Sequence, residues 1–210
     1  MLVAFDFDGT LSDSEMTVLL GDRQGVADEM AAITERAMND EIDYATSLRE
    51  RAALLKGLPE EAAAAAFDEV RLREDAAAVI DALRAAGHTV AVLTGGFERG
   101  VEAALARAGT TVDAVVANRL PVVDGELTGT VEGPLIEGTK DDALERLSTE
   151  YGVPVADTVA VGDGANDLPM LEAAGLAVGF APKPAVAPAC DVTVDSMAAL
   201  ETLLADRGLV

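Results

Sequence analysis

Two short apolar segments, far apart in the chain, each end in a cluster of aspartates and glycines. Residues 2–10 read LVAFDFDGT, and residues 159–169 read VAVGDGANDLP. Each apolar run has the length of a buried strand, and the carboxyl ends of parallel strands meet at one edge of an open α/β sheet. Four carboxylates are therefore predicted to lie close together at that edge: Asp6, Asp8, Asp163 and Asp167.

Four carboxylates at one sheet edge repel one another unless a cation lies between them. Carboxylate oxygens suit a hard divalent ion, most simply Mg²⁺. A calcium-binding loop fails on spacing, because a loop starting at Asp6 would place Thr10 and Leu11 where a ligand and a glycine are needed. A loop starting at Asp163 would place Ala165 at its third, ligating position. The sequence thus predicts a magnesium site.

Strand-like and helix-like stretches alternate from about residue 70 onward, which predicts a doubly wound parallel α/β sheet with helices on both faces. Expected strands cover 88–93, 112–117, 158–161 and 176–180, and expected helices cover 73–86, 97–108, 139–151, 168–174 and a last segment from Met197. Thr139, with an acidic residue three positions on, is expected to cap its helix. Asp124 and Gly125 predict a β-hairpin near 120–131.

Residues 12–70 differ from the rest of the chain. They contain no convincing strand, and their helical periodicity includes the alanine run 62–66. We expect the chain to leave the sheet after its first strand, form a small helical lobe over the aspartates, and return. The predicted organisation is a core domain of residues 1–11 and 71–210 and a helical cap domain of residues 12–70.

The chain is strongly acidic, with a formal net charge of −23, 38 acidic residues and only three lysines. Such a surface disfavours binding to nucleic acid and to anionic membranes. It predicts a protein of a salt-rich cytoplasm, the alternative being simply an acidic soluble protein. No apolar run reaches the length of a membrane span, and we read no signal peptide. Cys190 is the single cysteine, which excludes an internal disulfide and favours a cytoplasmic location.

The order of the chemical motifs resembles a known family. The segment DFDGT is followed by a strand ending in Thr94-Gly95-Gly96, then by Lys140, then by GDGANDLPM. This order is similar, over essentially the whole chain, to the haloacid dehalogenase superfamily of phosphohydrolases. Within it, the segments TGGF, ANRL, VGDGANDLPM and SLRERAALLKGLP (residues 94–97, 117–120, 161–170 and 47–59) resemble the phosphoserine phosphatase family.

This resemblance implies an aspartyl-phosphate mechanism. Asp6 matches the nucleophile that attacks phosphorus, and Asp8 matches the general acid and base. Mg²⁺ is then expected to be bound by the Asp6 carboxylate, the Asp8 backbone carbonyl and Asp163, with Asp167 supporting the metal site.

The resemblance also assigns residues to the phosphate. Thr94, Gly95, Gly96, Lys140 and Asn166 match the residues that hold it, and the two glycines expose backbone N–H groups suited to phosphate oxygens. The family usually has serine where this chain has Thr94, and threonine still offers a hydroxyl. Lys140 supplies positive charge, although a lysine at a helix start is disfavoured by the helix dipole.

Substrate choice is expected to lie in the helical lobe. Glu15 and Arg51 match the residues that bind the ammonium and carboxylate of phosphoserine. Tyr44 falls where the family often has phenylalanine. His88 begins a predicted strand far from any metal-ligating partner, and Cys190 has no basic neighbour, so we interpret both as structural.

The resemblance therefore implies an enzyme that hydrolyses O-phospho-L-serine to L-serine and phosphate, the last step of serine biosynthesis, as a monomer or homodimer. The nearest alternative is the same chemistry on another small phosphate ester, such as phosphohomoserine or phosphoglycolate. An alternative from a different enzyme class is transfer of the phosphoryl group to a second acceptor. A non-catalytic acidic binding module is a further alternative.

Overall fold

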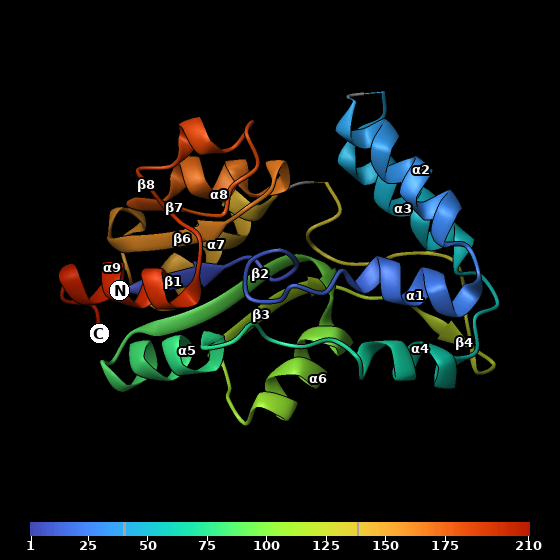
Figure 1. The fold of residues 1–210 in the computed structure, drawn as a ribbon, viewed down its shortest axis with the longest axis horizontal. Coiled ribbons are helices and arrows are strands. Elements are labelled where there is room, and N and C mark those ends of the chain that lie inside the picture. Colours follow the sequence, from blue (N-terminus) through green and yellow to red (C-terminus); the bar gives the residue numbers. More distant parts are fainter. Residues whose placement is uncertain (40, 138) are drawn as a thin grey trace.

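A six-stranded parallel sheet forms the centre of the protein (Figure 1). The computed structural model describes residues 1–39, 41–137 and 139–210. The strand order is β3-β2-β1-β6-β7-β8. The bounds are β1 Leu2–Phe5, β2 Thr89–Phe97, β3 Ala114–Asn118, β6 Thr158–Gly162, β7 Leu176–Phe180 and β8 Val192–Val194. The predicted α/β class is confirmed.

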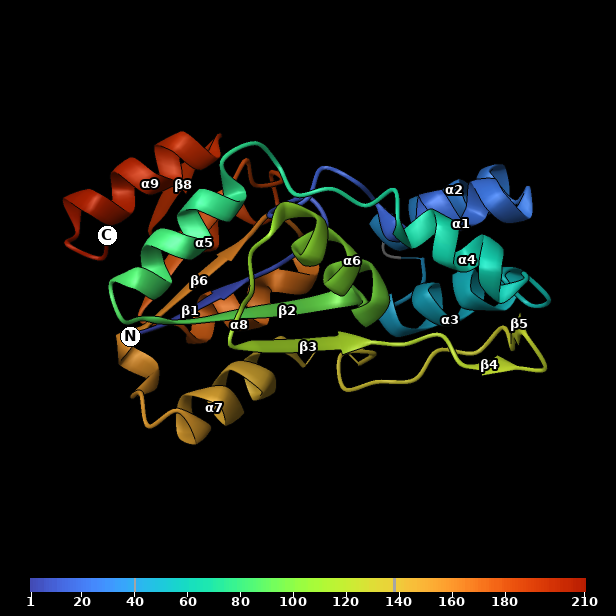
Figure 2. The same ribbon diagram turned by 90° about the horizontal axis from the view of Figure 1, so that it is seen from below.

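Helices cover both faces of the sheet because successive side chains of a buried strand point to opposite faces. Val3 and Phe5 of β1 pack with α5 (Ala76–Ala85), α6 (Glu98–Ala108) and α9 (Met197–Asp206). Leu2 and Ala4 pack with α7 (Lys140–Glu150) and α8 (Leu168–Ala173). Figure 2 shows α5 and α9 on one side of the strands and α7 on the other.

Four further helices lie between β1 and α5 in the described part of the chain. Their bounds are α1 Met16–Gln24, α2 Ala27–Met38, α3 Tyr44–Leu54 and α4 Glu60–Phe67. Figure 1 shows them together, beside the end of the sheet. Asp43 caps α3 by accepting from the Thr46 N–H, and alanine, the best helix former, fills α4. The predicted helical segment is thus helical, with position 40 outside the described residues.

The predicted hairpin is confirmed, with β4 (Val122–Val123) and β5 (Glu126–Leu127) joined by Asp124 and Gly125. It contacts the segment between α3 and α4. The Gly57 N–H donates to the Leu127 carbonyl, and the Leu127 N–H donates to the Leu58 carbonyl, both at 2.9 Å.

Three local predictions were wrong. Strand β2 does not end before Thr94 but continues to Phe97, with a bulge opposite β3, so α6 begins at Glu98. Helix α5 begins at Ala76, because Asp75 has a left-handed φ of 64°. Thr139 does not cap α7; its hydroxyl donates to the Pro134 carbonyl at 2.8 Å.

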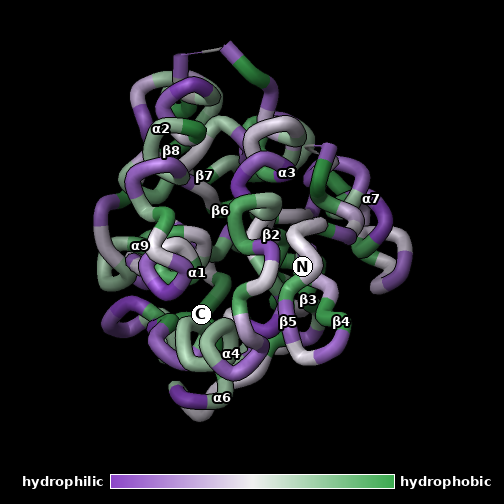
Figure 3. Tube along the Cα trace, turned by 90° about the vertical axis from the view of Figure 1, so that its right-hand side faces the viewer, coloured by the Kyte–Doolittle hydropathy of each residue, from purple (hydrophilic) through white to green (hydrophobic). Residues whose placement is uncertain are grey.

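Helices α2, α5, α6 and α7 are amphipathic, as expected for helices that pack on one side. Coloured by hydropathy, α2 and α7 alternate between hydrophilic and hydrophobic segments along their turns (Figure 3). None of the described helices combines the length and the apolar character that crossing a membrane requires.

Candidate active site

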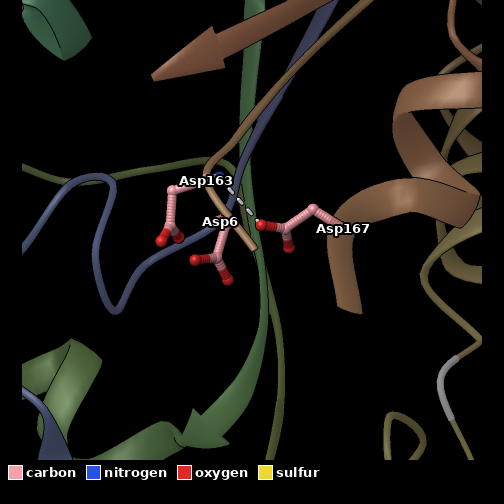
Figure 4. A group of neighbouring side chains, drawn as sticks. All are labelled: Asp6, Asp163 and Asp167. Carbon is pink, nitrogen blue, oxygen red and sulfur yellow. Dashed lines mark hydrogen bonds between the residues drawn. The ribbon is translucent and has the colours of Figure 1, made fainter. Parts of the chain in front are cut away.

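Three of the predicted aspartates meet at the carboxyl edge of the sheet (Figure 4). Asp6 follows β1, Asp163 follows β6, and Asp167 ends the short 3₁₀ helix Ala165–Asp167. One carboxylate oxygen of each lies within 4.8 Å of the others. They meet because β1 and β6 are neighbours in the sheet, and the pairing continues past β1 through the Asp6 N–H and the Val161 carbonyl at 2.8 Å.

Lys140 is buried between two of these carboxylates. Its Nζ lies 2.6 Å from Asp6 Oδ1 and 2.5 Å from Asp167 Oδ1, and the side chain is 2% exposed. Burial alone would lower the pKa of Lys140, but the charges of Asp167 and Asp6 outweigh it and raise the pKa. The ammonium is therefore kept charged at the start of α7, where the helix dipole disfavours a cation.

The Asp167 carboxylate fixes the loop after β6. Its Oδ2 accepts from the backbone N–H groups of Asp163, at 3.0 Å, and Gly164, at 2.9 Å. Its Oδ1 accepts from Lys140. Three donors thus engage this carboxylate, which orients Asp163 and Lys140 together.

Burial and crowding disfavour the charged form of the other aspartates. Burial, followed by the charge of Asp167, raises the pKa of Asp6 to about 7 against the opposing effect of Lys140. Burial and the charges of Asp6 and Glu15 raise the pKa of Asp8. Burial also raises the pKa of Asp163. Such a cluster accepts a cation or a proton more readily than isolated carboxylates do.

Asp8 reaches the same region from the loop after β1. Its Oδ1 is shielded from solvent and has no hydrogen-bond partner among the described residues. A Cβ on Gly96 would lie 2.7 Å from Asp8 Oδ2, and a Cβ on Gly95 would lie 1.7 Å from the Tyr44 hydroxyl. Glycine at these two positions therefore leaves room for the Asp8 and Tyr44 side chains. The Gly96 N–H donates to Thr94 Oγ1 at 2.9 Å.

A cavity of about 470 Å³ lies between the sheet edge and the helices α1–α3. Its sheet side is lined by Asp6, Asp8, Thr94, Gly95, Gly96, Asp163 and Asn166, and its helix side by Glu15, Thr17, Tyr44, Ser47 and Arg51. Both residues predicted for substrate choice therefore face one space with the aspartates. Lys140 and Asp167 do not line this cavity and lie behind Asp6.

The helix side of the cavity holds Arg51 in place. Arg51 is half-buried, and its Nη1 donates to Thr17 Oγ1 at 3.2 Å. Its Nε donates to the Ser47 carbonyl at 3.4 Å. Glu15 is exposed at the start of α1 and makes no capping hydrogen bond there.

Lys183 is a cavity residue that was not predicted from the sequence. It follows β7, lines the cavity, and places Nζ 3.2 Å from Asp163 Oδ2. Its backbone N–H also donates to the Asp163 carbonyl at 2.9 Å. Two signals in the sequence pointed to it, since the chain has three lysines and this one closely follows a predicted strand end.

Comparison with known proteins identifies the family. A family model for haloacid dehalogenase-like hydrolases matches residues 3–172. A phosphoserine phosphatase of Halobacterium salinarum is 60% identical over 208 residues, which cover 99% of each chain. The chain belongs to the phosphoserine phosphatase family of haloacid dehalogenase-like hydrolases. The predicted family resemblance is confirmed.

Solved structures of the phosphoserine phosphatase family share the fold. One, a phosphoserine phosphatase with a phospho-aspartyl intermediate analogue, has a TM-score of 0.88 and 38% identity over 98% of this chain and 97% of that one. A substrate-bound phosphoserine phosphatase has a TM-score of 0.89 and 37% identity over the same shares. The first of these relatives thus carries an analogue of the phospho-aspartyl intermediate that Asp6 of this chain is predicted to form.

Proposed function

We propose that this protein hydrolyses O-phospho-L-serine to L-serine and phosphate, as the last step of serine biosynthesis. One observation carries the proposal: a single cavity brings Asp6 and Asp8 together with Glu15 and Arg51. The first pair supplies a nucleophile and a proton donor. The second pair supplies one negative and one positive group for the ammonium and carboxylate of an amino acid.

Asp6 attacks phosphorus in line and becomes an aspartyl phosphate. Burial and the charge of Asp6 raise the pKa of Asp8, which favours the protonated form that gives its proton to the leaving serine oxygen. In the second step Asp8 takes a proton from the water that hydrolyses the acyl phosphate. Atoms balance, since one water is consumed and serine and phosphate are released.

The donor set fits a divalent metal. Asp6 and Asp163 present clustered carboxylates with raised pKa values, whereas Asp167 is already engaged by three donors. We assign the Mg²⁺ site to the carboxylates of Asp6 and Asp163 and the backbone carbonyl of Asp8, with Asp167 as the supporting residue. Bound Mg²⁺ supplies positive charge between the nucleophile and the phosphate dianion.

Phosphate oxygens are assigned to the polar groups beside Asp6. Thr94, Gly95, Gly96 and Asn166 line the cavity there, and the glycines let the phosphate approach the backbone. Lys140 contributes from behind the nucleophile. Its contact with Asp6 lowers the repulsion between that carboxylate and the phosphate.

Substrate choice is assigned to the cap domain, residues 12–70, over a core of residues 1–11 and 71–210. Glu15 binds the ammonium and Arg51 the carboxylate of phosphoserine. Arg51 donates hydrogen bonds to Thr17 Oγ1 and to the Ser47 carbonyl. These bonds support its role, because they fix the side chain at the cavity wall.

Phosphate release from a panel of esters tests the function. Phosphoserine, phosphohomoserine, phosphoglycolate and p-nitrophenyl phosphate are compared in molar KCl, with Mg²⁺ or with EDTA. The expected result is Mg²⁺-dependent turnover with the highest kcat/KM on phosphoserine. A clear preference for another ester contradicts the substrate, and transfer of the phosphoryl group to an added alcohol instead of water contradicts hydrolysis.

The two cap residues should act on different parts of the substrate. Glu15→Gln is expected to lower kcat/KM far more on phosphoserine than on phosphoglycolate, which has no amine. Arg51→Ala should lower kcat/KM on both of these esters and leave it nearly unchanged on p-nitrophenyl phosphate. Each lost charge-assisted bond is worth about 1.5–3 kcal/mol, or roughly 10- to 150-fold in kcat/KM.

Matched controls come from α2, a neighbouring helix of the same lobe. Glu29→Gln and Arg36→Ala alter α2 residues that do not line the cavity, and both should leave kcat/KM nearly unchanged on every ester. Equal losses on all three esters in the Glu15 and Arg51 variants would show that these residues are structural.

Salt should stabilise the protein, because the net charge of −23 makes the surface repel itself. At molar KCl the screening length is about 3 Å, which relieves this repulsion. Melting temperature and phosphoserine turnover are therefore expected to rise with KCl into the molar range. A melting temperature that is already maximal at low salt and flat thereafter would contradict salt adaptation.

A further inference from the structure

The loop after β1, which carries Asp8, leaves carbonyl groups for another part of the chain to bind. Within the loop, the Gly9 N–H donates to the Ser12 carbonyl and the Ser12 N–H donates to the Phe7 carbonyl, both at 2.9 Å. The Thr10 N–H also donates to the Phe7 carbonyl, at 3.2 Å, so three N–H groups of the loop are bound within it. The carbonyls of Gly9, Thr10 and Leu11 accept hydrogen bonds from outside the loop.

One distant residue, Arg73, binds all three carbonyls. Its Nη2 donates to the Gly9 carbonyl at 3.1 Å, and its Nε donates to the Thr10 carbonyl at 3.0 Å. Its backbone N–H donates to the Leu11 carbonyl at 2.8 Å. A guanidinium forms such a fork because its donors are fixed in one plane, which a lysine ammonium does not offer.

The guanidinium of Arg73 is itself fixed by the sheet. Its carbon atom lies 5.3 Å from the ring centroid of Phe180, within the range of a cation–π contact. Phe180 is buried at the end of β7. Arg73 therefore ties the loop after β1 to the carboxyl edge of the sheet, on which the proposed metal site is built.

The position of the Asp8 carboxylate depends on this loop. Its Oδ1 is shielded from solvent and has no hydrogen-bond partner among the described residues. No described side chain donates to Oδ1, so the backbone sets where the carboxylate lies. We infer that Arg73 is a positioning residue for Asp8, acting through the carbonyls of Gly9 and Thr10. The inference rests on the proposed role of Asp8 as the proton donor.

The dependence of rate on the leaving group tests this inference. Departure of the serine alkoxide needs a proton, whereas p-nitrophenolate leaves without one. The ratio kcat/KM covers only the steps up to that departure, so hydrolysis of the acyl phosphate does not enter. Arg73→Lys is expected to lower kcat/KM on phosphoserine by about 10- to 100-fold and on p-nitrophenyl phosphate by less than about 3-fold, since a small misplacement of a catalytic group is costly.

Two further variants separate positioning from general damage. Arg71→Lys is the matched control, because Arg71 Nη1 donates to the carbonyls of Asp68 and Val70, outside the loop. This variant should leave kcat/KM unchanged on both esters. Phe180→Leu removes the ring under the guanidinium while it keeps an apolar side chain in the core, and it should give a smaller loss of the same selectivity. If Arg73→Lys does not fold, the Phe180→Leu variant tests the positioning role of Arg73 in its place.

Asp8→Asn is measured in parallel, so that failure of the inference and failure of the proposed mechanism give different results. Selective loss on phosphoserine in Asp8→Asn but equal losses on both esters in the Arg73 and Phe180 variants would overturn the inference alone. Equal losses in Asp8→Asn would overturn the proton-donor role itself. If the ester panel favours another alkyl phosphate, that ester replaces phosphoserine in the same comparison.

Discussion

Asp6→Asn is expected to abolish phosphoserine turnover, by at least about 10⁴-fold, while the protein stays folded. An amide is neither a nucleophile toward phosphorus nor a good ligand for Mg²⁺, so both proposed functions of Asp6 are lost. Losing a nucleophile typically leaves only the rate that binding and electrostatics provide. Phosphate release and acid-quenched mass spectrometry for a covalent phosphoryl group would measure the loss.

The folded state of this variant should not suffer. The pKa of Asp6 is raised in the folded protein to about 7, above its value in an unfolded chain, so ionised Asp6 destabilises the metal-free fold as the pH rises between about 4 and 7. Asparagine carries no such penalty, and its amide oxygen still accepts from Lys140. At about pH 8 in EDTA, the melting temperature of Asp6→Asn is expected to equal or exceed that of the wild type.

Asp13→Asn provides a matched control, since Asp13 is exposed in the same region and does not line the cavity. It should leave turnover unchanged. Near-normal turnover in Asp6→Asn would refute the aspartyl-phosphate mechanism, and a large fall in its melting temperature would show that Asp6 is needed for the fold instead.

The sequence predicted those parts of the fold that local patterns determine. Strand β7 and the start of α9 lie where the pattern placed them, because β7 is a buried apolar run and Ser196 caps α9. Strand β8 was missed, since Val192–Val194 is too short for a periodic signal. The end of β2 was misplaced because Gly95 and Gly96 resemble a turn, yet here they continue a bulged strand.

In the site, too, some features could be predicted from local patterns and others could not. That Asp6, Asp163 and Asp167 meet was predictable, because strand ends share one edge of a parallel sheet. Contacts made by segments that carry no motif could not be predicted. Arg73 lies in an irregular stretch before α5, and only the folded chain brings its guanidinium to Gly9 and Thr10. The ion pair between Lys183 and Asp163 likewise forms only in the folded chain and has no motif that predicts it.

Lys140→Met is expected to lower the free energy of unfolding of the metal-free protein by about 3–5 kcal/mol. Removing one partner of a buried ion pair leaves its counterions without compensation, and here two carboxylates, Asp6 and Asp167, share the one ammonium. Turnover should fall as well, by roughly 10²–10³-fold, as when one preorganised donor beside a reacting group is lost. Chemical denaturation and phosphate release measure the two effects.

The loss of stability should depend on pH. Without the ammonium, the pKa of Asp6 rises further above its value in the unfolded chain, and a proton then takes the place of the lost charge. The penalty is therefore smallest below about pH 7, the pKa of Asp6 in the wild type, and grows as the pH rises above it. Neutralising the carboxylate has the same effect, so Asp6→Asn/Lys140→Met should recover part of the stability.

Lys183→Met is the matched control for Lys140→Met. Its ammonium also pairs with an aspartate of the site, 3.2 Å from Asp163 Oδ2, but the side chain is 56% exposed. Exposed pairs contribute at most about 1 kcal/mol, because water already solvates both charges. If the two lysine variants lost equal stability, or if the double variant recovered none, burial between the two aspartates would not explain why this chain keeps a lysine at the start of α7.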